Sequence, residues 1–339
     1  LLAALLLSPF AQAEGEKVVR LTQNVELDTL DISNTGDGYA TSMMALLLDS
    51  LFRLDENNVP QPALCESYTV SDDGLTYTFT LRDSKWSNGE PVTAADFVYS
   101  WKRTCNPANG FENAFLFNYV PIKNLPEISA GEADPDTLGV TAVDDKSLVL
   151  GLTTPCNWLL VFLCGCYFGP MNQEFVESCG DQYALSSDTL LTCGAFKLEG
   201  WTAGDLTWTI TKNEDYWAAD TVNVDAIEYQ VIKDTQTGIM AYESGTADYV
   251  ILSSDLVDMY RDNEAFYTAP TTYSWYIVPN FQVPELQNVN LRYAIGFAID
   301  REALVNNILA DGSLAKYDCN YSDVFFGSGG TQFNSVRPD

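Results

Sequence analysis

The chain has 339 residues, with 47 Asp and Glu against 17 Lys and Arg, a formal charge of −30, 46% apolar residues and no His. This length exceeds the roughly 250–300 residues that one hydrophobic core serves, so two or more compact units are expected. The charge argues against nucleic acid and anionic lipid as partners, and the lack of His excludes His-dependent nucleophiles and His-containing metal sites. We predict no cofactor and no metal site.

The first residues indicate export. A short apolar run, 1–7, precedes Ser8-Pro9-Phe10 and the small-residue triplet Ala11-Gln12-Ala13. This pattern is typical of a secretory signal that is cleaved after Ala13, and the run is too short to span a membrane. A buried apolar strand or helix is the alternative. We interpret residues 1–13 as part of a signal peptide, so we expect the protein in the periplasm or at the outer cell surface.

The mature chain is predicted to open with a strand near Val18, followed by a polar loop and an apolar helix at 42–48. The loop contains Gly36-Asp37-Gly38, where the two glycines allow a turn or a close approach to a ligand. Residues 68–82 alternate with period two around Asp73-Gly74, which predicts a hairpin. Thr93 with Asp96 predicts a capped helix whose Phe97 and Trp101 enter the core.

Further elements follow along the rest of the chain. We predict a hairpin at 139–152, a buried helix or strand at 158–170, strands at 195–198, 206–210, 226–232 and 249–252, and helices at 235–242, 290–299 and 301–309. Strands and helices are intermixed throughout, which favours an α/β or α+β fold over an all-β sandwich.

The chain has eight cysteines, five of them between 156 and 193. In an exported chain these predict at least one local disulfide, beside some buried apolar thiols. Cys164 and Cys166 are too close in sequence for an ordinary bridge to each other. A zinc site of four thiolates is the alternative, but the sequence has no C-x-x-C pair to support it.

Eight short strings occur in order along nearly the whole chain and together carry a resemblance. They are Pro62-Ala63-Leu64, the hairpin 70–82, the segment 86–103, Val143-Asp144-Asp145, Gly194-Ala195-Phe196-Lys197-Leu198, Lys212-Asn213-Glu214-Asp215-Tyr216-Trp217, Glu243-Ser244-Gly245 with Asp248, and Leu291-Arg292-Tyr293-Ala294-Ile295 leading to Ala298-Ile299-Asp300-Arg301. The chain thereby resembles the solute-binding proteins of ABC importers for oligopeptides and dipeptides, and most of all the oligopeptide-binding ones.

This resemblance implies an α/β fold with two lobes around a ligand cleft and an α+β domain inserted into the first lobe. By similarity, residues 14–48 and 172–272 form the first lobe, 49–171 the inserted domain, and 273–339 the start of an incomplete second lobe. Family members continue beyond the position of Asp339, and that part carries the acid that pairs with a peptide's α-amino group. We therefore expect this chain to bind peptides weakly or not at all.

The resemblance also supplies candidate peptide-binding residues. The loop Gly36, Asp37 and Gly38 matches a wall that touches the ligand's main chain, and an ordinary surface turn is the alternative. Phe111 and Asn113, which flank Glu112, match a ligand-side loop of the inserted domain. The family often has Tyr at the position of Asn113.

Three aromatic residues complete the predicted site. Tyr273, Trp275 and Tyr276 match the crossing between the lobes. Aromatic residues with a polar tip suit a wet peptide-binding cleft. A hinge strand packed into the core is the alternative.

The resulting hypothesis is a non-enzymatic monomer that captures oligopeptides by lobe closure and delivers them to the membrane subunits of an ABC permease. Alternatives are another cargo for the same fold, such as a dipeptide, nickel chelate or sugar. The alternative from another class of protein is a secreted glycan-acting hydrolase, because such enzymes use pairs of carboxylates and this chain has an excess of acidic residues.

Overall fold

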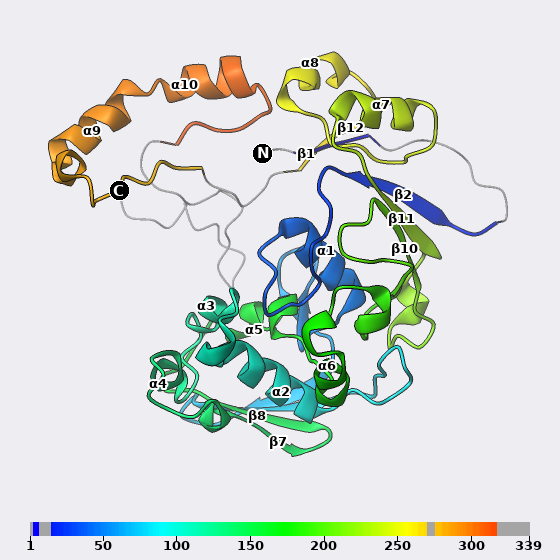
Figure 1. Ribbon diagram of the computed structural model, residues 1–339, viewed down its shortest axis with the longest axis vertical. Helices are drawn as coiled ribbons and strands as arrows, with labels where there is room; N and C mark the ends of the chain where they lie inside the picture. The colour runs from blue at the N-terminus through cyan, green and yellow to red at the C-terminus, as the bar shows by residue number, and fades with distance from the viewer. Residues whose placement is uncertain (1–2, 7–14, 270–274, 317–339) are drawn as a thin grey trace. The chain divides into compact units, whose positions relative to one another are not determined.

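A computed structural model describes residues 3–6, 15–269 and 275–316 (Figure 1). The chain divides into Gln12–Val231, here called the larger unit, and Leu1–Ala11 with Ile232–Asp339, called the smaller unit. The mixed α/β composition that the sequence predicts is confirmed. The boundaries of the lobes and of the inserted domain stay predictions.

One sheet of the larger unit contains strands from both the beginning and the end of that unit's sequence. Its strands are β2 (Val18–Gln23), β11 (Ala226–Val231), β10 (Thr207–Lys212) and β9 (Phe196–Glu199), in that spatial order. β2 runs parallel to β11, whereas β11, β10 and β9 are antiparallel neighbours. The predicted strands at the beginning of the chain and at 195–232 are therefore confirmed.

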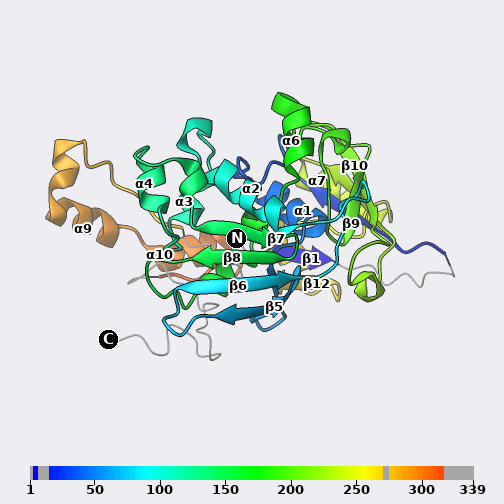
Figure 2. The same ribbon diagram turned by 90° about the horizontal axis from the view of Figure 1, so that it is seen from below.

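The second sheet of the larger unit is fully antiparallel. It contains β5 (Cys65–Val70), β6 (Thr76–Leu81), β8 (Ser147–Gly151) and β7 (Val140–Asp144), in that order (Figure 2). Both predicted hairpins are present, and Gly74 has the positive φ of +70° that the first turn requires. Phe79, Leu148 and Leu150 lie on the buried face of this sheet.

Helix α2 (Ala94–Cys105) covers β7 and β8. Its N-cap residue is Thr93, as predicted, and the carboxylate of Asp96 accepts the main-chain N–H of Thr93 at 2.8 Å. Phe97 and Trp101 are fully buried, and the Trp101 indole donates to the carbonyl of Phe168 at 3.0 Å. The capping pair and the apolar face thus both follow from the local sequence.

The remaining elements of the larger unit are short. They are the strands β3 (Phe52–Leu54) and β4 (Pro60–Pro62) and the helices α1 (Gly38–Leu47), α3 (Ala114–Phe117), α4 (Leu125–Ser129), α5 (Leu159–Phe162) and α6 (Gln173–Cys179). The apolar run 158–170 does not form one long element. It divides into α5 and a 3-10 turn, Cys166–Phe168, on either side of Gly165.

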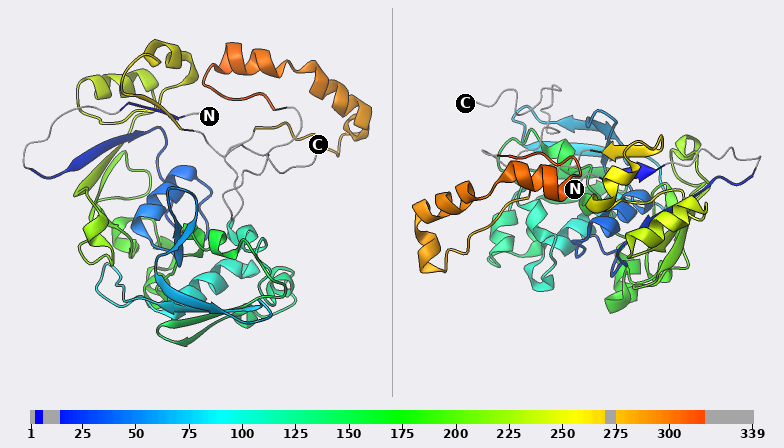
Figure 3. Two further views of the ribbon diagram at one scale, coloured as in Figure 1. Left: turned by 180° about the vertical axis from the view of Figure 1, so that it is seen from behind. Right: turned by 90° about the horizontal axis from the view of Figure 1, so that it is seen from above.

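The smaller unit contains the strand pair β1 (Ala3–Leu6) and β12 (Phe266–Ala269), with α7 (Thr235–Glu243) and α8 (Val257–Tyr260) beside it (Figure 3). Of the predicted strand at 249–252, Tyr249 lies in an isolated β-bridge, whereas residues 250–252 are not in a strand. Val250 and Leu252 instead pack with Ile239 of α7. A secretory signal at 1–13 stays a prediction.

Two predicted helices of the smaller unit are confirmed. α9 (Val289–Ala298) is followed by α10 (Arg301–Ala303), which continues as a π-helix, Leu304–Leu309. The carboxylate of Asp300 accepts the N–H of Ala303 at 2.9 Å and so caps the second helix, as expected for an Asp at this position.

The seven cysteines that the structure describes are all free thiols, so the disulfide predicted within 156–193 is absent from this structure. Burial explains their presence without a bridge, because Cys156, Cys166 and Cys193 are buried in the core of the larger unit. Burial raises the pKa of the Cys105 and Cys166 thiols to about 12, which keeps them protonated. Cys319 lies outside the described residues.

Candidate functional site

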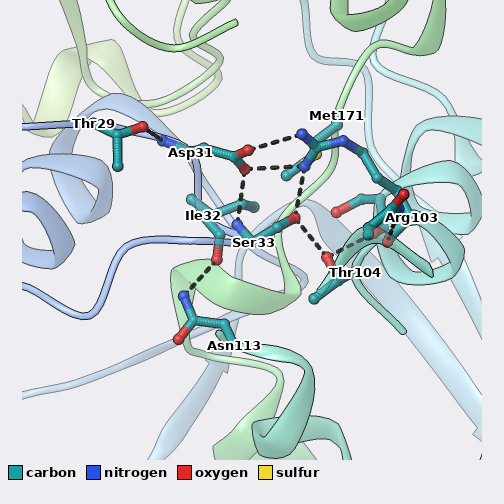
Figure 4. A network of polar contacts seen from close by, with 10 residues as sticks. Thr29, Asp31, Ile32, Ser33, Arg103, Thr104, Asn113 and Met171 are labelled. Atoms are coloured by element: carbon teal, nitrogen blue, oxygen red, sulfur yellow. Dashed lines mark hydrogen bonds and ion pairs between the residues drawn. The ribbon is translucent and has the colours of Figure 1, made fainter. Parts of the chain in front are cut away.

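A buried ion pair anchors the loop that contains the predicted Gly36-Asp37-Gly38 site. The guanidinium of Arg103, near the end of α2, donates to the carboxylate of Asp31 through Nη1 at 3.0 Å and Nη2 at 2.8 Å (Figure 4). Only 14% of the Arg103 side chain and 10% of the Asp31 side chain are exposed. Two parallel bonds fix the relative position of both groups, so this contact sets the place of the loop on α2.

Ser33 extends the same network. Its hydroxyl lies 2.8 Å from Nη1 of Arg103 and 2.7 Å from the hydroxyl of Thr104, and its N–H donates to Asp31 at 2.9 Å. Burial lowers the pKa of Arg103, but the hydrogen bonds and charge of Asp31 outweigh it and leave that pKa raised. The guanidinium therefore stays charged, as a buried pair requires.

Asn113 fastens the same loop from a second side. Its amide nitrogen donates to the carbonyls of Ile32 at 3.0 Å and Thr35 at 2.8 Å, and its N–H donates to the carbonyl of Ser33. The residue is 3% exposed. Its amide nitrogen is thus occupied with the loop, and a role of Asn113 in contacting a ligand stays a prediction.

Asp37 begins helix α1. Its carboxylate accepts the N–H groups of Tyr39 and Ala40, at 3.2 and 3.1 Å, as an N-cap residue does. The neighbouring Gly36 and Gly38 are exposed. Among the described residues, the N–H and carbonyl of Gly36 and the N–H of Gly38 have no hydrogen-bond partner. The loop therefore has unpaired main-chain groups at Gly36 and Gly38, while Arg103 and Asn113 fix the preceding residues by hydrogen bonds.

The structure brings the predicted residues Gly36 and Phe111 to the same region. The ring of Phe111 lies under the guanidinium of Arg103, with 4.3 Å from the guanidinium carbon to the ring centre. The carboxylate of Glu112, the residue after Phe111, lies directly against Gly36. The loops 31–38 and 111–113 thus form one surface within the larger unit.

The aromatic candidates belong to the smaller unit, and their role stays a prediction. Trp275 is 77% exposed and Tyr276 is 65% exposed, so neither is packed into a core by the described residues. Tyr273 lies outside the described residues.

Sequence reasoning missed the Asp31–Arg103 pair and the capping role of Asp37. The first pair joins residues 72 positions apart, and no local pattern indicates such a contact. A signal for the second did exist, because an Asp directly before the helix that contains Tyr39 is a typical N-cap. The predicted start of that helix at Ser42 was therefore too late, since α1 begins at Gly38.

Comparisons with known proteins give a consistent result. A family model described as bacterial extracellular solute-binding proteins, family 5 Middle, matches residues 59–336. The dipeptide-binding protein DppE of Bacillus subtilis is 31% identical over 299 residues, which are 88% of this chain and 54% of DppE. The chain therefore spans about half the length of this relative.

Solved structures match the fold over a similar share. Listeria monocytogenes OppA bound to peptide superposes with a TM-score of 0.82 and 33% identity, over 88% of this chain and 60% of that protein. The substrate-binding domain of an oligopeptide ABC transporter from Bacillus anthracis gives a TM-score of 0.82 and 35% identity, over 98% and 65%. Among the described helices, none has the length and apolarity that a membrane crossing needs.

Proposed function

This chain belongs to the bacterial extracellular solute-binding proteins of family 5, and we propose that it captures oligopeptides for an ABC importer. A solute-binding protein carries its ligand without chemical change, so the family assignment overturns the alternative of a glycan-acting hydrolase. The peptide cargo is supported by relatives whose names state peptide binding, including DppE and the peptide-bound OppA.

The open main chain at Gly36 is the observation that carries this proposal. An extended peptide can bond to unpaired N–H and carbonyl groups in the way that an added strand does, which gives affinity with little dependence on side chains. The support beneath the loop matters equally, because Arg103 and Asn113 hold it in place before a ligand arrives. Preorganisation of this kind lowers the entropic cost of binding.

Calorimetry with the intact protein, meaning a protein that contains both lobes, tests the proposal. We expect an unmodified neutral hexapeptide to bind, and we expect N-methylation of at least one of its amides to weaken binding about tenfold, because a main-chain hydrogen bond is lost. A series from two to eight residues measures the preferred length, and we propose that peptides longer than two bind best. Equal binding of all N-methylated peptides would contradict main-chain recognition, and a preference for dipeptides would support the alternative cargo.

We further propose that two lobes close on the peptide, with 14–48 and 172–272 in the first lobe, 49–171 inserted in it, and 273 onward in the second. Binding would shift a hinge equilibrium toward the closed form, which the membrane subunits of an ABC permease then accept. We place the protein outside the cytoplasm as a monomer. Small-angle scattering is expected to show a smaller radius of gyration with peptide than without it, and an unchanged radius would contradict closure.

A further inference from the structure

The carboxylate of Glu112 lies directly on the main chain of Gly36. A methyl group added to the Cα of Gly36 would lie 2.9 Å from Oε1 and 3.0 Å from Oε2 of Glu112. Glycine therefore leaves the space that this carboxylate occupies, beside the unpaired N–H and carbonyl of the loop. A peptide that bonds to Gly36 must pass next to this charge.

The charge of Glu112 is not neutralised by the part of the chain that the structure describes. Its side chain is exposed and has no ion pair or hydrogen bond there. Two cations lie in the last turn of α2: Arg103 is already bound by Asp31 and covered by Phe111, and Lys102 is paired with Asp136. The other acid of the loop, Asp37, differs, because both its oxygens accept helix N–H groups. Glu112 is thus the loop carboxylate that is open to a ligand.

We infer that Glu112 selects peptides that carry a positive charge next to the residue paired with Gly36. The inference rests on the proposed function and names its substrate class. The ligand cation is an ammonium or guanidinium group, from either the peptide's N-terminus or a Lys or Arg side chain. A neutral peptide would cover part of the Glu112 carboxylate and remove water from it without supplying a partner. A cationic peptide supplies an opposite charge that offsets this desolvation cost.

Three hexapeptides that differ only in charge test the inference. The first is acetylated and neutral, the second is acetylated with one Lys, and the third has a free N-terminus without Lys. The intact protein is compared with Glu112→Gln and with the control Glu132→Gln, which removes an equal charge from another exposed position of the larger unit. Affinities are measured by calorimetry at low ionic strength, where exposed charges are least screened.

We expect at least one cationic peptide to bind about three- to tenfold more tightly than the neutral one, the range for a partly exposed ion pair. Glu112→Gln should abolish this advantage. Because the variant has no carboxylate to dehydrate, it should bind the neutral peptide at least as tightly as the unchanged protein does, and this binding also shows that the variant is folded. Glu132→Gln should keep the advantage. The peptide that loses affinity in Glu112→Gln identifies whether the cation is the N-terminus or a side chain.

Two different results would overturn two different statements. Equal binding of all three peptides would overturn the role of Glu112. An advantage that persists in Glu112→Gln would overturn it as well, and would assign the preference to the general field of the −30 chain. Binding of none of the peptides by the intact protein would overturn the proposed function, and the role of Glu112 with it. Glu112→Lys adds a further check, because it should reverse the preference between neutral and cationic peptides.

Discussion

Asn113 holds two carbonyls of one loop with a single amide nitrogen, so a small chemical change there should loosen the whole loop. Asn113→Asp replaces the donor by a buried carboxylate that faces two carbonyl oxygens. We expect a loss of about 2–4 kcal/mol in the free energy of unfolding, measured with urea, because a buried charge and two acceptors are left without partners. Amide hydrogen exchange over residues 32–38 should become faster.

The matched control is Asn118→Asp, the same change at an exposed position. It should alter the free energy of unfolding by less than about 0.5 kcal/mol, as substitutions of exposed residues generally do. Equal effects of the two variants would show that the bonds from Asn113 to Ile32 and Thr35 do not stabilise the loop.

The buried carboxyl group of Asp49 predicts how the free energy of unfolding of the larger unit changes with pH. Burial raises the pKa of Asp49 above its usual 3.8, and hydrogen bonds from the Trp217 indole, at 2.7 Å, and the Tyr216 hydroxyl, at 3.0 Å, only partly oppose this. Since the folded pKa is the higher one, the contribution of Asp49 to stability is complete below about pH 4 and declines as the pH rises through the folded pKa.

Asp49→Asn should remove this decline, because an amide oxygen can accept the same two bonds without a charge. We expect the stability of the variant relative to the wild type to increase as the pH is raised from 4 to 7, measured by chemical unfolding at each pH. The acids that do not contact Asp49 contribute equally to both curves, so the difference between the two proteins reports on Asp49. Parallel stability curves would be the contrary result.

At the scale of elements, the sequence predicted best where the signal is local. Helix α2 has its cap at Thr93 and an apolar face of Phe97 and Trp101, and both β-hairpins have a period-two pattern. The strand expected at 249–252 is limited to a bridge at Tyr249, because buried apolar residues also occur in irregular segments that pack on a helix, as Val250 and Leu252 do. The run 158–170 failed for a related reason, since apolarity alone does not distinguish one long helix from two short ones.

Removal of the N-terminal cap of α2 should lower the free energy of unfolding by a predictable amount. A single oxygen of Asp96 accepts the N–H and hydroxyl of Thr93 and the indole N–H of Trp86. Asp96→Ala leaves these donors without an acceptor near the core, so we expect the free energy of unfolding to fall by about 2–4 kcal/mol. Asp96→Asn keeps an acceptor oxygen and should cost less.

The control for the cap is Asp136→Ala, which removes an exposed partner of Lys102 on the same helix. Exposed ion pairs contribute about 0–1 kcal/mol, so this change should be small. A loss in Asp136→Ala as large as that in Asp96→Ala would mean that the charge near α2, and not the cap, determines its stability.

For the whole molecule, the order of recognisable strings led to the correct family, but the site needed the structure. Contacts such as Arg103 with Asp31 and Glu112 with Gly36 join positions more than 70 residues apart, and their geometry depends on how α2 packs. The sequence could therefore indicate which loops to consider. It could not show that Asn113 supports one of them or that Glu112 faces it.

The charge of −30 is a property of the whole chain, and it predicts an unusual response to salt. Repulsion among 47 acids opposes the compact state, and raising NaCl from 0.01 to 0.15 M shortens the screening length from about 30 to 8 Å. The buried Arg103–Asp31 pair is screened much less, so its contribution should persist. We expect Tm at pH 7.5 to rise by about 2 °C or more, which corresponds to about 1 kcal/mol in a chain of this size.

The same salt change at pH 5, nearer the isoelectric point of about 4.1, should raise Tm less because fewer acids are charged. A Tm that is independent of salt at pH 7.5, or equal shifts at the two pH values, would show that self-repulsion does not limit the stability of this protein.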